Sequence, residues 1–164
     1  MQHSSKGSFD NFLHSKTELR PGNAVGLIIQ SDDGKYLLQH RDDKAEIFFP
    51  NHWCMFGGGI DHKESPTDAA IRETQEELGI IISPDRLSYI TTLWFDFSFE
   101  NAREPYSRIF LAMAISNDEI QQLKLGEGQG MSFLTIEEAL TRVQIAPYDA
   151  MALWMYHAKN RLTA

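Results

Sequence analysis

Residues 58–80 read GGIDHKESPTDAAIRETQEELGI, and this stretch decides the fold of the chain. Its second half predicts a helix from about Pro66 to about Leu78. Ser65 can cap the first turn of that helix, and Pro66 suits its first position because no helical hydrogen bond is lost there. Gly79 follows the last apolar residue and suits the left-handed end of a helix. The helix therefore has clear start and stop signals, and it follows a glycine-rich turn.

Three glutamates lie on one side of this predicted helix. Glu73, Glu76 and Glu77 spread over roughly 100° of its surface at 3.6 residues per turn. Taken alone, an acidic stripe of this kind is most often a solvated helix face. Because carboxylates at this spacing repel one another and hard divalent cations prefer oxygen ligands, a metal site is the alternative. The adjacent arc carries the side chains expected to face a core, namely Ala70, Ile71, Thr74 and Leu78.

The spacing of glycines and charged residues in this stretch resembles that of the Nudix hydrolases. The family pattern is G-x5-E-x7-R-E-U-x-E-E-x-G-U, where U is a bulky aliphatic residue. Thr74, at the first U position, is the single departure, and its β-branched side chain is close to valine in shape. The resemblance is strong over this box and weaker over residues 22–140. It implies an α/β fold, specifically an α/β/α sandwich with a mixed β-sheet. The positions in register are Gly58, Glu64, Arg72, Glu73, Glu76, Glu77, Gly79 and Ile80.

The resemblance also implies an activity and a cofactor. It implies hydrolysis of the pyrophosphate bond in a nucleoside diphosphate linked to another group, with Mg²⁺ as the ion and Mn²⁺ as the alternative. Arg72 and Glu64 are implied to pair and to orient the metal ligands, and Glu73 is one candidate for the catalytic base. The implied ligands are the backbone carbonyl of Gly57 and the carboxylates of Glu73, Glu76 and Glu77.

Positions outside the helix extend the expected site. Residues 126–132, GEGQGMS, resemble a stretch of MutT-like family members in which the glutamate is catalytic. The match implies that Glu127 binds a metal or activates water, and an ordinary loop acid is the alternative. Arg41 resembles an arginine that contacts substrate in the same members, and a surface charge is the alternative. Gly58 and Gly59 are expected to lie against the substrate, because glycine lets a backbone approach a ligand closely.

No motif decides how a base is recognised. The single cysteine, Cys54, cannot form an internal disulfide and is expected to be buried. His62 lies in the box, but no HxxxH or HExxH pattern accompanies it to indicate zinc. Trp154 and Tyr156 are expected to pack in the core or in a dimer interface. The aromatic candidates for stacking on a purine are Trp94, Phe95, Tyr106 and Phe110.

Length and composition favour one globular domain. The chain has 164 residues, 42% of them hydrophobic and 23% charged, which suffices for a core. A net charge of -8 without a basic stripe argues against binding to polymeric nucleic acid. No apolar run is long enough for a membrane span, and the N-terminus lacks a secretory signal. We expect a cytoplasmic protein with a small nucleotide substrate, acting as a monomer or a homodimer.

Hydrophobic patterning gives the expected order of elements. Residues 1–21 are expected to form an N-terminal arm, and residues 22–164 a single domain. Thr135 and Glu138 form a capping-box signal for a short helix. Strands are expected at 24–29, 36–40, 53–56, within 87–99, at 106–115 and at 131–134, with loops or turns at 31–34, 42–52 and 101–105 and helices at 135–140 and 149–162.

The substrate is narrowed only by markers that the sequence lacks. Leu93–Phe97 has no proline where some ADP-ribose hydrolases of the family carry one, and the coenzyme A signature is missing. The box also keeps the glutamate that GDP-mannose hydrolases of the family have lost. The leading interpretation is a MutT-like nucleoside triphosphate pyrophosphohydrolase. A nucleotide-sugar hydrolase of the GDP-mannose type, a dinucleoside polyphosphate hydrolase and a non-catalytic Nudix-fold nucleotide sensor stay open.

Overall fold

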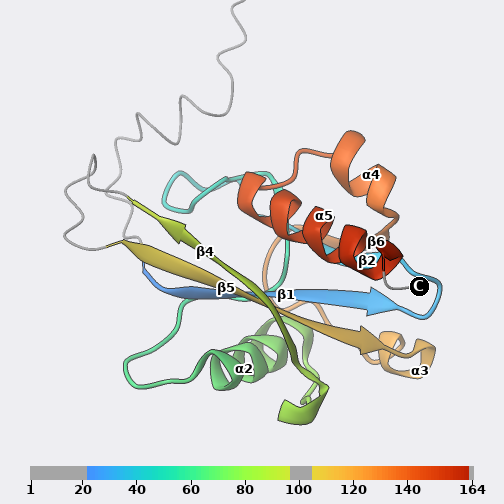
Figure 1. Ribbon diagram of the computed structural model, residues 1–164, viewed down its shortest axis with the longest axis horizontal. Coiled ribbons are helices and arrows are strands. Elements are labelled where there is room, and N and C mark those ends of the chain that lie inside the picture. The colour runs from blue at the N-terminus through green and yellow to red at the C-terminus, as the bar shows by residue number, and fades with distance from the viewer. Residues whose placement is uncertain (1–21, 97–104, 163–164) are drawn as a thin grey trace, which may run out of the picture.

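The computed structural model describes residues 22–96 and 105–162, which Figure 1 draws in colour. The expected N-terminal arm and the expected turn at 101–105, except for its last residue, lie outside the described residues. The described chain forms a mixed sheet between two layers of helices (Figure 1). The α/β/α sandwich that the sequence implies is therefore confirmed.

The sheet has the strand order β3-β2-β1-β5-β4, and β6 pairs with β2 along the whole length of β2. β1 and β5 run parallel, whereas the remaining strand pairs are antiparallel. Figure 1 looks at the sheet from the β4 edge, so β4 lies in front and β2 and β6 lie behind. The strands are β1 Ala24–Ser31, β2 Tyr36–His40, β3 Trp53–Cys54, β4 Ser88–Phe95, β5 Tyr106–Ile115 and β6 Gly130–Leu134.

Helices cover both faces of this sheet. α2 (Pro66–Leu78) lies on one face, and α5 (Pro147–Leu162) lies on the other beside α4 (Ile136–Thr141) (Figure 1). Two short helices, α3 (Asn117–Ile120) and the 3-10 helix η1 (Pro84–Arg86), adjoin the strands. One buried apolar cluster joins α2 to the sheet, and a second joins α5 and α4 to the opposite face. These two layers hold α2 rigidly against β1.

Most expected elements lie where the patterning places them, with differences at their ends. The expected strand at 53–56 ends at Cys54, because Phe56 forms only an isolated bridge with Leu27 of β1. The last helix begins at Pro147, two positions before the expected start at Asp149. Proline suits this first position because it forgoes no helical hydrogen bond.

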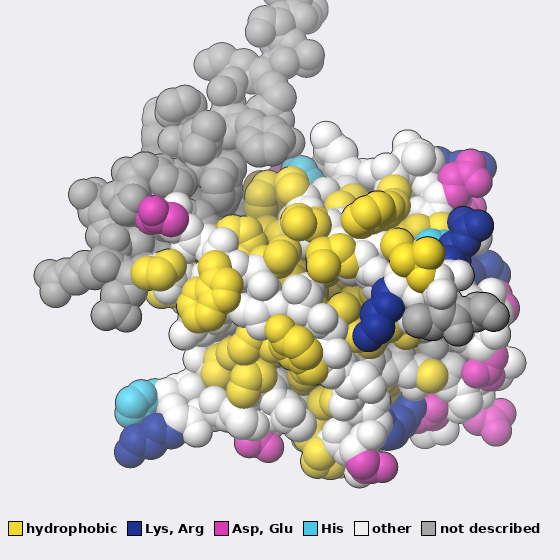
Figure 2. Space-filling view, in the orientation of Figure 1, with side chains coloured by type: hydrophobic (Ala, Val, Ile, Leu, Met, Phe, Trp, Pro, Cys, Tyr) yellow, Lys and Arg dark blue, Asp and Glu magenta, His cyan; other side chains and the backbone are white. Residues whose placement is uncertain are grey.

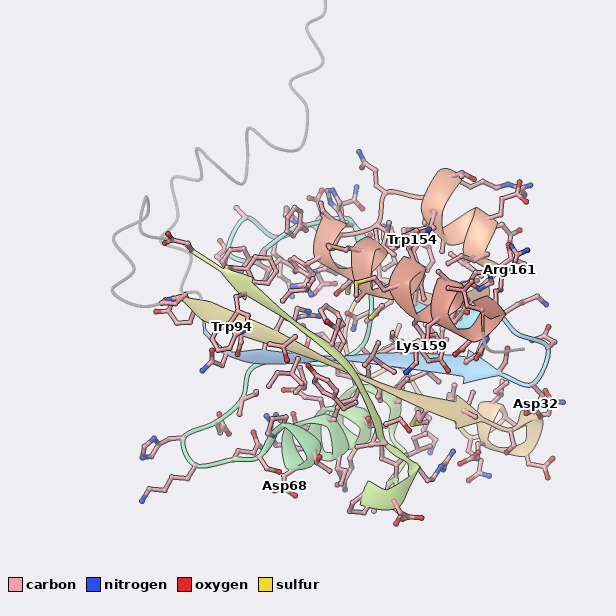
Figure 3. All side chains as sticks on the ribbon, in the orientation of Figure 1. Asp32, Asp68, Trp94, Trp154, Lys159 and Arg161 are labelled. Carbon is pink, nitrogen blue, oxygen red and sulfur yellow. The ribbon has the colours of Figure 1, made fainter. Side chains whose placement is uncertain are left out.

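The outer side of α5 is more exposed than expected. Trp154 is 58% exposed, so the expectation that it packs in the core is wrong. Tyr156 packs edge-on against Tyr36, with ring centroids 6.2 Å apart. Figure 2 shows hydrophobic side chains gathered over the β4 edge and α5, and Figure 3 shows Trp94 and Trp154 on this face. Whether a second copy covers them stays a prediction.

Helix length also bears on membrane association. Across residues 22–96 and 105–162, no helix combines the length and the apolar character needed to cross a bilayer.

Candidate active site

The helix that carries the three glutamates is closed at both ends by its own sequence. The Ser65 hydroxyl accepts a hydrogen bond from the backbone N–H of Asp68 at 3.1 Å. Gly79 has a φ of 72°, the left-handed value expected for a helix-ending glycine, and its N–H donates to the carbonyl of Gln75. The predicted bounds of α2, Pro66–Leu78, are confirmed. These caps fix which glutamates face the sheet.

Arg72, in the middle of this helix, is the centre of an ion-pair network. Its Nε and Nη2 donate to the two carboxylate oxygens of Glu64 at 2.9 and 3.0 Å. Its Nη1 donates to Glu73 at 2.7 Å and to Glu76 at 3.3 Å. Nη2 also donates to the carbonyl of Gly59 at 2.8 Å. One guanidinium therefore ties the glycine-rich turn, the box loop and two glutamates of the stripe together.

Glu77 faces inward rather than along the exposed part of the stripe. It is only 6% exposed, and its Oε2 accepts a hydrogen bond from the N–H of Gly57 at 2.8 Å. Gln39 of β2 donates to its other oxygen at 3.4 Å. Burial, with smaller contributions from the charges of Glu73 and Glu127, raises the pKa of Glu77 to about 7 despite the hydrogen bond from Gly57. A buried carboxylate with this environment gains from a nearby cation.

Glu73 shares this environment to a smaller degree. Burial raises its pKa, while the hydrogen bond from Arg72 lowers it. Its carboxylate lies against Gly58, where a Cβ would come within 2.4 Å of Oε1. Any side chain at position 58 would therefore displace the glutamate, which explains the glycine without reference to a ligand.

The glycine-rich turn leaves one carbonyl open toward these acids. The carbonyl of Gly58 accepts from Val25 of β1, and that of Gly59 accepts from Arg72. Within the described chain, the carbonyl of Gly57 accepts no hydrogen bond. Gly57 has a φ of 126°, and a Cβ there would meet the Val25 carbonyl at 2.5 Å. Glycine is therefore required at 57, and its carbonyl is available as an oxygen ligand.

The loop before β6 brings Glu127 to the same place. The N–H of Gly126 donates to the carbonyl of Glu77 at 2.8 Å, and Gln39 donates to the carbonyl of Glu127 at 3.1 Å. The N–H of Gln129 donates to the carbonyl of His40 at 2.8 Å. The Glu127 side chain is exposed, and its charge raises the pKa of both Glu73 and Glu77. Glu127 thus lies near the stripe although about fifty positions separate them in sequence.

The acids and the open carbonyl form a hard-oxygen set that suits Mg²⁺. No three acidic, histidine or cysteine side chains of the described residues are arranged around a common point, since Arg72 holds Glu73 and Glu76. A cation here would offset the burial and the neighbouring negative charges that together raise the pKa of Glu77. The residues therefore fit the expected ion, and the assignment of individual ligands stays a prediction.

Arg41 lies beside this acid cluster without touching it. Its Nη1 donates to Cys54 Sγ at 3.7 Å, and its Nε is enclosed without a hydrogen-bond partner in the described part of the chain. Cys54 is buried as expected, and burial raises the pKa of its thiol to about 12. The thiol is therefore not a nucleophile at neutral pH, and the expected substrate contact of Arg41 stays a prediction.

The four aromatic candidates for base stacking have different environments. Phe110 is completely buried between the sheet and α5, so its proposed contact with a base is wrong. Trp94 is 69% exposed on the β4 edge (Figure 3). Phe95 packs edge-on against Tyr148, with centroids 5.8 Å apart. The alternation of side chains along β5 does not show which face of the strand α5 covers, so the burial of Phe110 could not be predicted.

A second ion pair joins Arg108 of β5 to Asp149 of α5, and no sequence motif predicts it. Arg108 Nε donates to Asp149 Oδ1 at 3.2 Å, and Asp149 is completely buried. Asp149 was expected only as the first residue of the last helix, where an acid is ordinary. No local signal joins two residues on different elements that are 41 positions apart.

Comparison with known proteins agrees with the family that the box resembles. The family model described as the NUDIX domain matches residues 20–154. An uncharacterized Nudix hydrolase of Listeria monocytogenes, lmo0368, is 27% identical over 160 residues, covering 92% of this chain and 91% of the relative. The chain spans less than half the length of two further curated relatives, 45% and 23%.

Solved structures share the fold. The MutT protein of Methanosarcina mazei Go1 has a TM-score of 0.68 at 20% identity, covering 87% of this chain and 97% of that protein. An Ap4A hydrolase of C. elegans, solved as a binary complex, has a TM-score of 0.64 at 25% identity, covering 86% and 98%.

Proposed function

Since this chain belongs to the Nudix family of pyrophosphohydrolases, we propose that it is a Mg²⁺-dependent, MutT-like enzyme that cleaves nucleoside triphosphates to a nucleoside monophosphate and pyrophosphate. The observation that supports this most is the network around Arg72, which gathers Glu64, Glu73 and Glu76 beside the buried Glu77. A protein that only binds nucleotides has no need of this complete set of acids.

The ion would be held by the Gly57 carbonyl and by the carboxylates of Glu73, Glu76 and Glu77, with Glu127 as a further ligand or base. When bound, Mg²⁺ supplies positive charge to phosphate oxygens and lowers the pKa of a coordinated water. The chain itself supplies orientation. Arg72 and Glu64 fix the glycine-rich turn against α2, and Glu77 receives the N–H of Gly57.

The proton of the attacking water needs an acceptor, and two glutamates are candidates. The Glu73 carboxylate is already engaged, because its Oε1 accepts a hydrogen bond from Arg72 at 2.7 Å. Among the described residues, the Glu127 carboxylate has no hydrogen-bond partner, and it is exposed. A free carboxylate within reach of water is better suited to take a proton. We assign this role to Glu127, held in place through its backbone by Gln39.

A dinucleoside polyphosphate is the second candidate substrate, and the similarity to the C. elegans Ap4A hydrolase favours it. Such a substrate has the same phosphoanhydride bonds with a second nucleoside in place of the terminal phosphate. Nucleotide sugars differ in the same position. All three classes use the same acids, so the choice among them depends on groups outside the helix.

The decisive experiment is a substrate panel with and without Mg²⁺. It contains ordinary and oxidised nucleoside triphosphates, a dinucleoside tetraphosphate, ADP-ribose and GDP-sugars, and it measures release of pyrophosphate and phosphate. Mg²⁺-dependent pyrophosphate release from a triphosphate is the expected result. Faster cleavage of the dinucleotide would replace the leading proposal by the second candidate, and tight binding without any turnover would support a nucleotide sensor.

Glu127→Gln tests the assigned base, with Glu137→Gln as the matched control. Glu137 is an exposed glutamate of α4, away from the acid cluster. Glu127→Gln should lose about 100-fold or more in kcat, the typical effect of removing a general base. Retention of full kcat in this variant would return the role to Glu73.

A further inference from the structure

A second charged cluster lies on the α5 side of the sheet. Asp149 is completely buried, and its Oδ2 accepts the N–H of Met55 at 3.0 Å while its Oδ1 accepts Nε of Arg108 at 3.2 Å. Both carboxylate oxygens are therefore used by the protein. Arg108 is held in one position, with its Nε committed to this pair.

The other end of Arg108 has donors but no protein acceptors. Its guanidinium lies over the ring of Tyr148, with 4.8 Å between Cζ and the ring centroid, and 5.6 Å from the centroid of Phe110. Considering residues 22–96 and 105–162 alone, neither Nη1 nor Nη2 makes a hydrogen bond, and neither is fully enclosed. The side chain is 13% exposed, so its open end reaches the surface.

A second guanidinium with unused donors lies nearby. Arg41 donates only to the sulfur of Cys54, a weak acceptor, and its Nε is enclosed and unpartnered in the described structure. The charges of Arg41 and Arg108 act on each other, and the single carboxylate of Asp149 serves both. The cluster therefore has two cations, one anion and a surplus of N–H donors, of which Arg41 Nε is buried without a partner and the Arg108 donors are open to water or to a ligand.

This cluster is joined to the acid cluster by one side chain. Cys54 Sγ donates to Gln39 Oε1 at 3.5 Å, and Gln39 Nε2 donates to Glu77 at 3.4 Å. The positively charged guanidiniums and the negatively charged glutamates thus form two neighbouring clusters of opposite charge. A nucleotide with its phosphates at the acids can place its base at the guanidiniums.

We propose that Arg108, positioned by Asp149, contacts the base of the substrate and selects bases that present two adjacent acceptors on one edge. A guanidinium fork pairs with two neighbouring acceptors, as it does with N7 and O6 of guanine. Cytosine presents such a pair in N3 and O2. Adenine and uracil do not, because a donor stands beside their acceptors. The inference rests on the proposed function in taking the substrate to be a nucleotide.

The test measures binding rather than turnover, so that it is independent of the proposed activity. GMP, CMP, AMP, UMP and ribose 5-phosphate are titrated into the full chain by calorimetry with a chelator present. GMP and CMP should bind at least about tenfold more tightly than AMP and UMP, the discrimination expected of one bidentate contact. Ribose 5-phosphate should bind as weakly as AMP.

Variants then assign the preference to Arg108. Arg108→Gln should bring GMP and CMP down to the affinity of AMP, and Arg108→Lys should do the same because a lysine lacks the fork. Arg142→Gln is the matched control, since Arg142 is an exposed arginine at the end of α4. Thermal melting checks that each variant folds. If Arg108→Gln does not fold, the nucleotide preference of the wild type still tests the inference.

Each of the following results would overturn the inference: equal binding of the four nucleotides by the wild type, an unchanged preference in Arg108→Gln, or retention of the preference in Arg108→Lys. Ribose 5-phosphate could bind as tightly as GMP, with this binding weakened in Arg108→Gln. That result would show that Arg108 contacts the phosphate, and it would also overturn the inference. If no substrate of the panel is cleaved but GMP and CMP still bind more tightly than AMP and UMP, only the proposed hydrolysis is refuted.

Discussion

Arg72 and Glu64 form a two-pronged ion pair, with Nε and Nη2 of the arginine at 2.9 and 3.0 Å from the two oxygens of the glutamate. The pair is mostly shielded from solvent, with side-chain exposures of 29% and 15%. A planar guanidinium matches a carboxylate in this way, whereas a lysine makes only a point contact. The pair therefore fixes the loop before α2 in direction as well as in distance.

Replacement of Arg72 should damage stability and activity together. Arg72→Ala leaves Glu64, Glu73 and Glu76 without their cation, and the free energy of unfolding should fall by about 1–3 kcal/mol. Arg72→Lys should recover part of this stability and little of the activity. Urea unfolding and steady-state kinetics on the three proteins provide the measurement. An alanine variant with wild-type kcat would show that the pair has no part in orienting the site.

Replacement of Glu76 should separate the two effects. Its side chain is 60% exposed, and Arg72 lies 3.3 Å away, so the pair contributes little to folding. Glu76→Gln should change the unfolding free energy by less than about 0.5 kcal/mol while removing most of the Mg²⁺-dependent rate. Kinetics across Mg²⁺ concentrations test this, with Glu137→Gln as the control. Equal rates in the two variants would argue against Glu76 as a metal ligand.

Mg²⁺ should raise the thermal stability of the folded chain. An ion that binds only the folded state adds about 2.7 kcal/mol when its concentration is 100 times its Kd. Melting curves recorded over a Mg²⁺ series should therefore shift upward for the wild type and for Glu137→Gln. The shift should be much smaller for Glu76→Gln. Curves that coincide at all Mg²⁺ concentrations would contradict a metal site in the acid cluster.

Gly126 should be intolerant of any side chain. A Cβ at this position would lie 2.2 Å from the backbone carbonyl of Glu76, which cannot move without disturbing α2. Gly126→Ala should lower the unfolding free energy by about 1–3 kcal/mol and displace Glu127. Gly130→Ala is the matched control, because a Cβ at Gly130 meets nothing within 4 Å. Similar stabilities for both variants would mean that the loop is not packed on α2.

The ion pair between Arg86 and Glu119, remote from the site, should make the free energy of unfolding depend on pH in the acid range. Hydrogen bonds from Arg86 lower the pKa of Glu119 from 4.5 to about 2. Since the folded-state pKa is the lower one, the pair stabilises the protein fully above pH 4.5 and loses this effect as the pH falls toward 2. The difference in unfolding free energy between wild type and Glu119→Gln should therefore shrink between pH 6 and pH 2.5. A difference that is constant with pH would refute the shift.

Local sequence signals predicted the parts of the site that lie close together in the chain. Ser65, Pro66 and Gly79 determine α2 through hydrogen bonds within a few residues, so its bounds could be read directly. The same kind of signal was present and overlooked at α3, where Ser116 and Glu119 form a capping box. The resemblance of the box supplied the pairing of Arg72 with Glu64.

Contacts between distant segments could not be predicted in this way. The polarity of Glu77 indicated an exposed side chain, but the N–H of Gly57 and the amide of Gln39 allow its burial. Phe110 is among the candidates for base stacking because alternation along a strand does not show which face a helix covers. The pairing of Arg108 with Asp149 depends on the docking of α5 on the sheet, which no short stretch encodes.

The last turn of α2 is completed by another segment of the chain. The N–H groups of Lys124 and Gly126 donate to the carbonyls of Leu78 and Glu77, where a free helix end would bond to water. Because these hydrogen bonds join the two segments, we expect fraying of the last turn of α2 and withdrawal of the Glu127 loop to occur as one event. Amide hydrogens at 124 and 126 should therefore exchange with solvent at a shared rate, and the Glu127 loop should not open without loosening the end of α2.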